Sequence, residues 1–231
     1  KKHLFSMILF DEVSKKYPNG KIAVEHINLK IDDGDFVFFV GQSGAGKTTL
    51  LKLLIQEIKP SSGSVYLDDW EVNKLNRKQL PFLRRKIGFV FQDFKLFYDR
   101  TVAENIGLAL EILGGKQPEI EKRVCEVIDI VRLSGKDDHF PKQLSLGEQQ
   151  RISIGRAIAG GAKVLLADEP TGNLDPKTSW EILKIFQDIN KLGTTIIMAT
   201  HNADIVNTMR KRVITLDDGK IKKDGVNSKY S

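Results

Sequence analysis

The chain contains 231 residues, of which 41% are hydrophobic, and its formal net charge is +6 at pH 7. A chain of this size can bury one sizeable core and still carry a small additional subdomain. No apolar run approaches the roughly 20 residues of a membrane-spanning helix, and we expect no signal peptide. These features argue against an integral membrane protein, so any membrane association is expected to go through a partner.

The positive charge is scattered, with its densest clusters at 84–86, 210–212 and 220–223. Such clusters occur in proteins that bind nucleic acid and in proteins that work beside an anionic membrane surface. A solvated basic surface is the third alternative, and it is the one that charge alone favours.

Cys125 is the only cysteine, which rules out an internal disulfide and is typical of a reducing compartment. Beside it, Val124, Val127 and Ile128 recur at helical spacing. We therefore predict that Cys125 is a packing residue of a helix.

In chain order, the first half of the chain alternates strand patterns with one helical pattern. Asp33-Gly34 marks a turn between two strand-like stretches, and Pro60 ends the helical pattern. Strands are predicted at 8–17, 26–40, 63–72 and 86–93, and a helix at 46–58. This alternation predicts an α/β fold with a mostly parallel sheet.

The second half begins with a helical stretch from about 94 to 158, in which no clear strand pattern occurs. Its helical segments are 102–113, 119–133 and 147–159; strands then follow at 162–168 and 193–200, and a closing hairpin at 212–225. We predict one domain, 7–231, with an α/β core formed by 7–93 and 159–231 and an inserted helical subdomain at about 94–158. Residues 1–6 are set aside as a possible extension or tag.

Residues 41–48, GQSGAGKT, lie directly behind a predicted buried strand and match the pattern G-x-x-x-x-G-K-[ST]. Glycines let the backbone approach phosphate oxygens closely, and the helix that begins near Gly46 adds its partly positive N-terminus. Lys47 can reach the β- and γ-phosphates, and Thr48 can hold Mg²⁺. A chance match is expected in about one in a hundred chains of this length. The sequence therefore predicts a nucleoside triphosphate site.

A second motif stands at the end of the apolar run in KVLLADEP, residues 163–170. A carboxylate at the tip of a buried parallel strand, here Asp168, suits Mg²⁺ ligation through water. Glu169 can orient or deprotonate an attacking water as a general base. Ordinary helix-capping acids are the alternative, which the presence of the phosphate-binding pattern at 41–48 makes less favoured.

The segment LSLGE, 144–148, resembles the signature of ABC ATPases, although by itself it would be taken as the start of a capped amphipathic helix. The other family motifs occur in the family's order. Tyr17 matches the aromatic that stacks on adenine, and Gln92 matches the glutamine that senses Mg²⁺ and the attacking water. Asp175 matches the D-loop aspartate, and His201 matches the switch histidine at the γ-phosphate. A lone tyrosine or histidine is usually structural, but the ordered set overrides that prior.

The resemblance implies a P-loop NTPase (RecA-like) core of ABC ATPase type, with an antiparallel β subdomain and an inserted α-helical subdomain. It also implies that the signature of one subunit closes over ATP held by the P-loop of another, so that two ATP molecules lie in a homodimer. The predicted catalytic residues are Lys47, Gln92, Glu169 and His201; the Mg²⁺ ligands are Thr48, Gln92 and Asp168; and the ATP contacts are Tyr17, Gly41, Gln42, Ser43, Gly44, Ala45, Gly46, Lys47, Thr48, Thr49, Ser145, Gly147, Glu148 and Asp175.

One position departs from the family pattern. Leu146 stands where the family usually has glycine. A side chain there lies near the γ-phosphate and crowds dimer closure, whereas Ser145 and the Gly147 N–H remain. We predict that ATP binding persists and that turnover is slow.

Ribosome-acting ABC proteins resemble two fused cassettes and DNA-repair members carry long coiled coils; neither pattern is present, and we expect no nucleic acid. Segments 80–106 and 165–176 look like the branch that contains FtsE, the LolD lipoprotein-release ATPase and the MacB exporter cassette. Further segments, 39–54 and 198–221, look most like FtsE. LolD-like release and MacB-like export remain the alternatives.

Resemblance to the FtsE branch implies an FtsX-like integral membrane partner that docks near Phe94, Phe97 and Tyr98, an aromatic cluster for which core packing is the alternative. It implies work on peptidoglycan hydrolases or their activators, carried out indirectly from the cytoplasmic face of the bacterial cell membrane at the division site.

Overall fold

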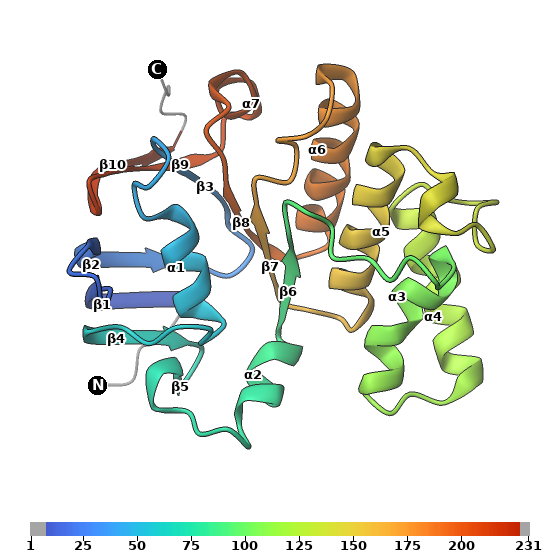
Figure 1. Ribbon diagram of the computed structural model, residues 1–231, viewed down its shortest axis with the longest axis horizontal. Coiled ribbons are helices and arrows are strands. Elements are labelled where there is room, and N and C mark those ends of the chain that lie inside the picture. The colour runs from blue at the N-terminus through green and yellow to red at the C-terminus, as the bar shows by residue number, and fades with distance from the viewer. Residues whose placement is uncertain (1–7, 227–231) are drawn as a thin grey trace. The chain divides into compact units, whose positions relative to one another are not determined.

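The computed structural model describes residues 8–226, so the possible extension at 1–6 lies outside the described residues. The chain divides into two compact units (Figure 1). Among the described residues, the first unit comprises 8–84 and 195–226, and the second comprises 85–194. Within 8–226, no helix has both the length and the hydropathy that crossing a membrane requires.

The first unit contains an antiparallel sheet in which the strands follow the order β2-β1-β4-β5. On β1, Phe10 lies opposite Leu29 on one side and Val65 on the other, and all three side chains are buried. This cross-strand row forms one apolar face of the sheet. The strands are β1 (Ile8–Lys16), β2 (Ile22–Ile31), β4 (Ser62–Leu67) and β5 (Trp70–Glu71).

The same unit contains β3 (Phe36–Val40), which pairs in parallel with β8 (Thr195–Ala199) and β9 (Arg212–Asp217). All five residues of β3 are buried, as expected of a central strand in a parallel sheet. β10 (Lys220–Val226) pairs antiparallel with β9 and confirms the predicted closing hairpin. The helical elements are α1 (Lys47–Leu54), η1 (Val72–Lys74) and α7 (Ala203–Met209), and α2 (Leu80–Arg85) spans the sequence boundary between the units.

The second unit combines the parallel strands β6 (Ile87–Val90) and β7 (Val164–Asp168) with a group of helices. Gly155 of α5 lets α3 and α4 approach closely, because a Cβ there would lie 3.0 Å from Ile106 and 3.2 Å from Val127. Figure 1 shows these three helices side by side. The helical elements are α3 (Val102–Ile112), α4 (Gln117–Ile130), η2 (Pro141–Gln143), α5 (Leu146–Ala159) and α6 (Pro176–Lys191).

Three predictions of local structure are wrong. The strand expected at 63–72 is interrupted by a turn at Asp68-Asp69, which separates β4 from β5. The helix expected at 46–58 ends at Leu54, because Gln56 adopts a left-handed φ of 48° and its side-chain amide donates to the Val72 carbonyl at 2.6 Å. Cys125 is exposed and is not a packing residue. It lies about 100° around α4 from Val124, which is buried. Val127 and Ile128 fill the buried face, and Cys125 falls beyond its edge.

Candidate functional site

The phosphate-binding motif forms the loop between β3 and α1. Gly41 and Gly46 have positive φ values of 146° and 108°. A Cβ on Gly41 would lie 2.2 Å from the Leu216 carbonyl oxygen, and one on Gly46 would lie 2.7 Å from the Ala23 carbonyl oxygen. The two glycines are therefore required both by the backbone conformation and by the close approach of neighbouring strands.

Within the described chain, no side chain caps the start of α1, whose N-cap residue is Gly46. The first-turn N–H groups and the helix dipole therefore favour an anion there. Lys47 is 7% exposed, and its ammonium donates to the carbonyls of Gly41 at 2.6 Å and Gln42 at 3.1 Å. Thr48, the predicted Mg²⁺ ligand, is exposed at the surface of this first turn.

Tyr17 and His201 also belong to the first unit. Tyr17 follows β1, is partly buried, and has the Lys15 ammonium 5.5 Å from its ring centroid. His201 follows β8 and is exposed.

In the second unit, Asp168 is the last residue of β7 and Glu169 follows it with a left-handed φ of 49°. Gln92 follows β6 and is exposed. A Cβ on Gly172 would lie 3.5 Å from the Gln92 amide nitrogen and 3.7 Å from the Glu169 Cβ. The Asn173 amide donates to the Gln92 carbonyl at 3.5 Å. The structure thus brings Gln92 and Glu169 together with residues 172–175, the GNLD turn that contains Asp175.

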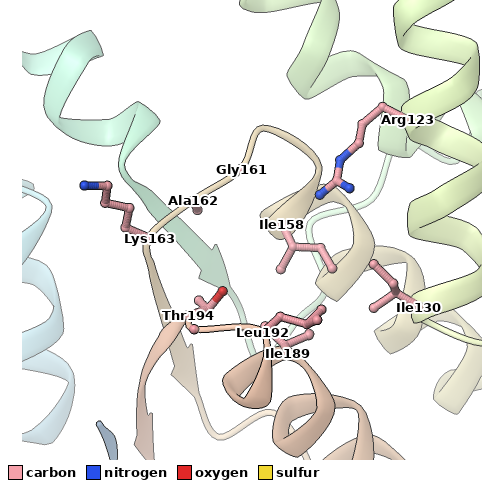
Figure 2. Close-up of a pocket in the computed structure, with 10 residues that line it drawn as sticks. Arg123, Ile130, Ile158, Gly161, Ala162, Lys163, Ile189, Leu192 and Thr194 are labelled. Atoms are coloured by element: carbon pink, nitrogen blue, oxygen red, sulfur yellow. The ribbon is translucent and has the colours of Figure 1, made fainter. Parts of the chain in front are cut away.

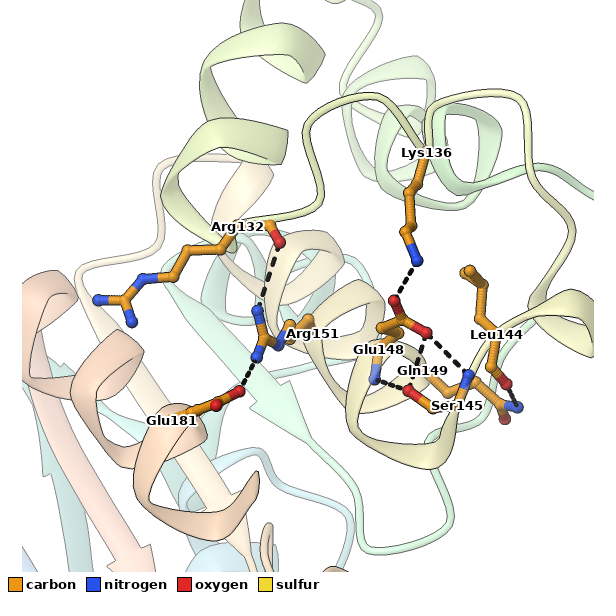
Figure 3. Close-up of polar contacts among 8 residues, drawn as sticks. All are labelled: Arg132, Lys136, Leu144, Ser145, Glu148, Gln149, Arg151 and Glu181. Atoms are coloured by element: carbon orange, nitrogen blue, oxygen red, sulfur yellow. Dashed lines mark hydrogen bonds and ion pairs between the residues drawn. The ribbon is translucent and has the colours of Figure 1, made fainter. Parts of the chain in front are cut away.

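The signature segment begins α5 with a complete capping box, drawn in Figure 3. Ser145 donates its hydroxyl proton to the Glu148 carboxylate at 2.8 Å and its backbone N–H at 2.9 Å, while the Glu148 N–H donates weakly to the Ser145 hydroxyl at 3.4 Å. Lys136 forms an ion pair with the same carboxylate. Partial burial raises the pKa of Glu148, but hydrogen bonds from Lys136 and Ser145 outweigh this effect and lower it from 4.5 to about 2.

Gly147 lies where α5 and α6 begin. A Cβ on Gly147 would lie 2.3 Å from the Thr178 Cγ2. Thr178 is held in place because its hydroxyl and its N–H donate to Asp175 at 2.5 and 3.0 Å, and these bonds lower the pKa of that carboxyl. Asp175 is thereby the N-cap of α6, and it lies close to the signature. By contrast, Leu146 projects outward and is 52% exposed.

The predicted residues divide between the two units. Tyr17, residues 41–49 and His201 lie in the first unit, whereas the second unit holds Gln92, Ser145, Gly147, Glu148, Asp168, Glu169 and Asp175. Sequence reasoning missed Lys136 and Gln150. No spacing rule links Lys136 to Glu148, because an irregular segment separates them. Gln150 offered a signal, since it puts a polar side chain on the buried face of α5.

A pocket of about 300 Å³ lies elsewhere in the second unit and shares no residue with the predicted site (Figure 2). Of its two charged side chains, only Arg123 is turned toward another lining residue, Ile158. Arg123 pairs with Glu126 at 3.0 Å, and the Lys163 side chain points away from the other labelled residues. The lining residues are Arg123, Ile130, Ile158, Gly161, Ala162, Lys163, Ile189, Leu192, Gly193 and Thr194.

The family model of the ABC transporter matches residues 24–172, which is more than half of the chain. The chain belongs to the ABC transporter family. It is an ABC-type ATPase, so ATP is its nucleotide. The P-loop, Gln92, the signature and Asp168-Glu169 lie within the matched range, whereas Tyr17, Asp175 and His201 lie outside it.

This ABC ATPase resembles curated relatives over nearly its whole length. It is 51% identical to the cell division ATP-binding protein FtsE of Bacillus subtilis, with 97% of this chain and 98% of the relative covered. Against FtsE of Mycobacterium tuberculosis, identity is 48%, with 94% and 95% covered. Against FtsE of Escherichia coli, it is 44%, with 92% and 96% covered.

Solved structures confirm the fold class. cbiO1 from Clostridium perfringens, part of an ABC transporter complex, superposes with a TM-score of 0.90 at 32% identity, covering 96% of this chain and 89% of that chain. A dimeric ATP-binding cassette in a post-hydrolysis state, bound to ADP and Pi, gives a TM-score of 0.86 at 35% identity, covering 97% and 100%. The ABC ATPase architecture predicted from the sequence is therefore correct.

Proposed function

We propose that this ABC ATPase is the energy-supplying subunit of a bacterial cell-division complex and acts through an FtsX-like membrane protein on peptidoglycan hydrolases or their activators. The observation that carries the proposal is the 44–51% identity to relatives named cell division ATP-binding protein FtsE, over nearly the whole of both chains. ABC transporters as a class share the nucleotide chemistry, so the ATPase motifs alone do not distinguish a division role from transport.

The proposed chemistry draws on both units. In the first, the P-loop N–H groups and Lys47 hold the β- and γ-phosphates, and Tyr17 stacks on adenine. Residues 42–45 and Thr49 complete the cradle. His201 contacts the γ-phosphate and stabilises the charge that develops on it.

In the second unit, Glu169 takes the proton from the attacking water, and Gln92 orients that water. Thr48, Asp168 and Gln92 would hold Mg²⁺, whose bound charge neutralises the phosphate oxygens. Among the described residues, no cluster of three His, Cys, Asp or Glu side chains forms a metal site. Mg²⁺ usually keeps several waters and takes few protein ligands beside the phosphates.

We propose that two copies close around two ATP molecules. Dimeric structures of a bacterial ABC cassette, 35–36% identical to this chain, support this arrangement. In it, Ser145, Gly147 and Glu148 serve the ATP held by the other copy, and Asp175 lies at the interface. Closure with ATP and opening after hydrolysis would provide the conformational stroke.

The membrane partner is proposed to dock on the loop after β6. Phe97 and Tyr98 are 44% and 45% exposed, whereas Phe94 is buried and supports the loop from beneath. The Arg156 guanidinium holds this loop by donating to the Phe94 and Lys95 carbonyls at 2.9 and 2.6 Å, and it lies 5.9 Å from the Phe97 ring centroid. Two adjacent exposed aromatic rings on a firmly held loop suit an apolar partner helix.

Co-purification tests the division role. The tagged chain would be isolated from detergent-solubilised membranes of its native host with ATP present, and its partners identified by mass spectrometry. An FtsX-like membrane protein, with a cell-wall hydrolase or its activator, is the expected result. A lipoprotein-release or drug-export permease would instead establish the LolD-like or MacB-like alternative and leave the ATPase unchanged.

The docking surface is tested by Phe97→Asp, which places a charge in the proposed apolar contact. Partner recovery is expected to fall at least about tenfold, because burying an unpaired carboxylate is costly, while binding of a fluorescent ATP analogue stays within about twofold. Phe140→Asp is the matched control, since Phe140 is 42% exposed elsewhere in the same unit. Equal partner recovery with both variants would contradict the assigned surface.

A further inference from the structure

Gln150, on the second turn of the signature helix α5, has an unusual environment. Its side chain is completely buried, and its amide nitrogen donates to the Pro170 carbonyl at 2.7 Å. Its amide oxygen has no hydrogen-bond partner within residues 8–226. Burying an amide with half of its bonding capacity unused is unfavourable, and an apolar side chain of the same size would avoid that cost. The hydrogen bond from the Gln150 side chain to the Pro170 carbonyl therefore calls for a functional reason.

That bond is made to the residue directly after Glu169. Glu169 has a left-handed φ of 49°, which a residue with a Cβ rarely adopts, and it precedes a proline, which restricts its backbone further. Strained conformations persist only where the surroundings hold them, and they concentrate at functional sites.

The hydrogen bonds that hold this turn include one from within it and one from α5. The Gly172 N–H donates to the Glu169 carbonyl at 3.1 Å, which closes the turn from within. Gln150 binds the next carbonyl, that of Pro170, from a different element. The direction in which the Glu169 side chain leaves the backbone therefore depends on the position of α5.

The start of α5 is itself held firmly. Ser145 and Glu148 close its capping box, and Lys136 pairs with Glu148. Little more than one helical turn separates Ser145 from Gln150. A displacement of the signature is accordingly transmitted through a short rigid segment to the carbonyl that Gln150 holds.

We propose that Gln150 is a positioning residue that aligns Glu169 with the attacking water and makes this alignment depend on the position of the signature helix. The inference rests on the proposed function, in which Glu169 is the general base and the signature meets the ATP of the other copy. Each copy would thus adjust its own catalytic base according to the nucleotide that its signature meets.

The test is a double-mutant cycle on the full chain with Gln150→Met and Glu169→Gln, measured by ATP turnover and by affinity for a non-hydrolysable ATP analogue. Methionine keeps the length of glutamine and loses the donor. We expect Gln150→Met to lower kcat about five- to tenfold, the range that one neutral hydrogen bond can account for, with analogue affinity within about twofold. In the Glu169→Gln background, the same change should have no further effect.

Ser153→Ala is the matched control. Ser153 lies on the next turn of α5, is 1% exposed, and its hydroxyl has no partner within the described chain, so removing it breaks no hydrogen bond. Its kcat is expected to match that of the wild type. Thermal unfolding would be followed for all variants, and Gln150→Leu replaces the methionine variant should that one not fold.

Three results would overturn the inference alone: wild-type kcat in Gln150→Met, equal losses in both backgrounds, or parallel losses of kcat and affinity, which indicate a merely structural role. Wild-type turnover in Glu169→Gln would instead overturn the proposed role of Glu169 and, with it, the inference. The failure of the inference and the failure of the proposed mechanism are thereby distinguishable.

Discussion

The helices α1 and α5 both begin at residues that the sequence assigns to ATP, yet their first turns are built in opposite ways. α1 begins behind Gly46, and within the described chain no side chain caps it and no acid stands in its first turn. α5 begins at Ser145, which exchanges hydrogen bonds with Glu148, and Lys136 neutralises that glutamate. The first turn of α1 therefore has no side-chain cap, whereas in α5 the side chains of Ser145 and Glu148 each accept from the other's N–H.

This difference indicates two kinds of contact with phosphate. The donors of α1 are available to several phosphate oxygens at once, as tight binding of a polyanion requires. On α5, the Ser145 hydroxyl proton is already given to Glu148, so a phosphate must compete for it. The P-loop is therefore suited to hold the nucleotide, and the signature is suited to a weaker, reversible contact.

The largest expected effect is at the P-loop. Lys47→Met should lower ATP turnover at least about 100-fold, because it removes a buried charge from the centre of the cradle. Steady-state phosphate release measures it. Lys52→Met, one and a half turns along α1, removes a lysine that pairs with Glu57 and should leave turnover within about twofold of wild type. Similar turnover in both variants would contradict the contrast between α1 and α5, because the start of α1 would then not be the place where the nucleotide is held.

Next in size is Gly147→Ala. The new Cβ would lie 2.3 Å from the Thr178 Cγ2, so α5 and α6 must separate. We expect a loss of about 1–3 kcal/mol in unfolding free energy from overpacking and a several-fold loss of turnover, measured by urea unfolding and ATPase assay. Gly107→Ala is the control, because its Cβ meets nothing closer than 3.5 Å. Unchanged stability in Gly147→Ala would show that the helix starts are not tightly packed.

A smaller effect, of opposite sign, is expected from Leu146→Gly. Removing this 52% exposed side chain relieves the proposed crowding at dimer closure, and turnover should rise about two- to fivefold. ATP-dependent dimerisation, followed by light scattering in a Glu169→Gln background, should strengthen in parallel. Leu192→Gly, at a residue 73% exposed beyond α6, should change neither. If Leu146→Gly also changes neither, the crowding hypothesis fails.

The smallest effect concerns pH. Because the folded pKa of Glu148, about 2, lies below its ordinary 4.5, the ionised carboxylate stabilises the fold above pH 4.5, and this contribution is lost as pH falls from 4.5 toward 2. Wild type should therefore exceed Glu148→Gln in unfolding free energy at pH 7 by about 0.2–1 kcal/mol, and this difference should be clearly smaller at pH 3. Urea unfolding at pH 7, 5 and 3 measures it.

A constant difference for Glu148→Gln would mean that the network with Lys136 and Ser145 does not depend on the charge of the carboxylate.

Much of the fold follows from local sequence signals. The P-loop glycines predicted the turn before α1. Five consecutive apolar residues predicted the buried strand β3. The predictions that failed concern features that depend on residues distant in the sequence. The end of α1 is set by a bond from Gln56 to Val72, and periodicity within 46–58 contains no information about that bond. For the same reason, the sequence predicted Ser145 as a cap but not the lysine that fixes its partner glutamate.

The candidate site shows the same limit. Motif order identified Gln92, Glu169 and Asp175 one by one, because each motif is local. That Gln92 lies against the GNLD turn, and that Gln150 reaches the carbonyl after Glu169, are consequences of tertiary packing. The exposure of Cys125 was predicted wrongly because consecutive residues point in different directions around a helix. A residue next to a buried one can therefore face the solvent.

The close packing of the P-loop has a consequence for how the protein is made. Gly41 lies against the Leu216 carbonyl, and Gly46 lies against Ala23, which is also in close contact with Gly219 of the β9–β10 turn. Ala23 and the loop are translated before most of the chain, but Leu216 and Gly219 emerge roughly 10–30 s later at about 5–20 residues per second. A nascent chain therefore completes the packing around its P-loop only after β9 and the β9–β10 turn have emerged.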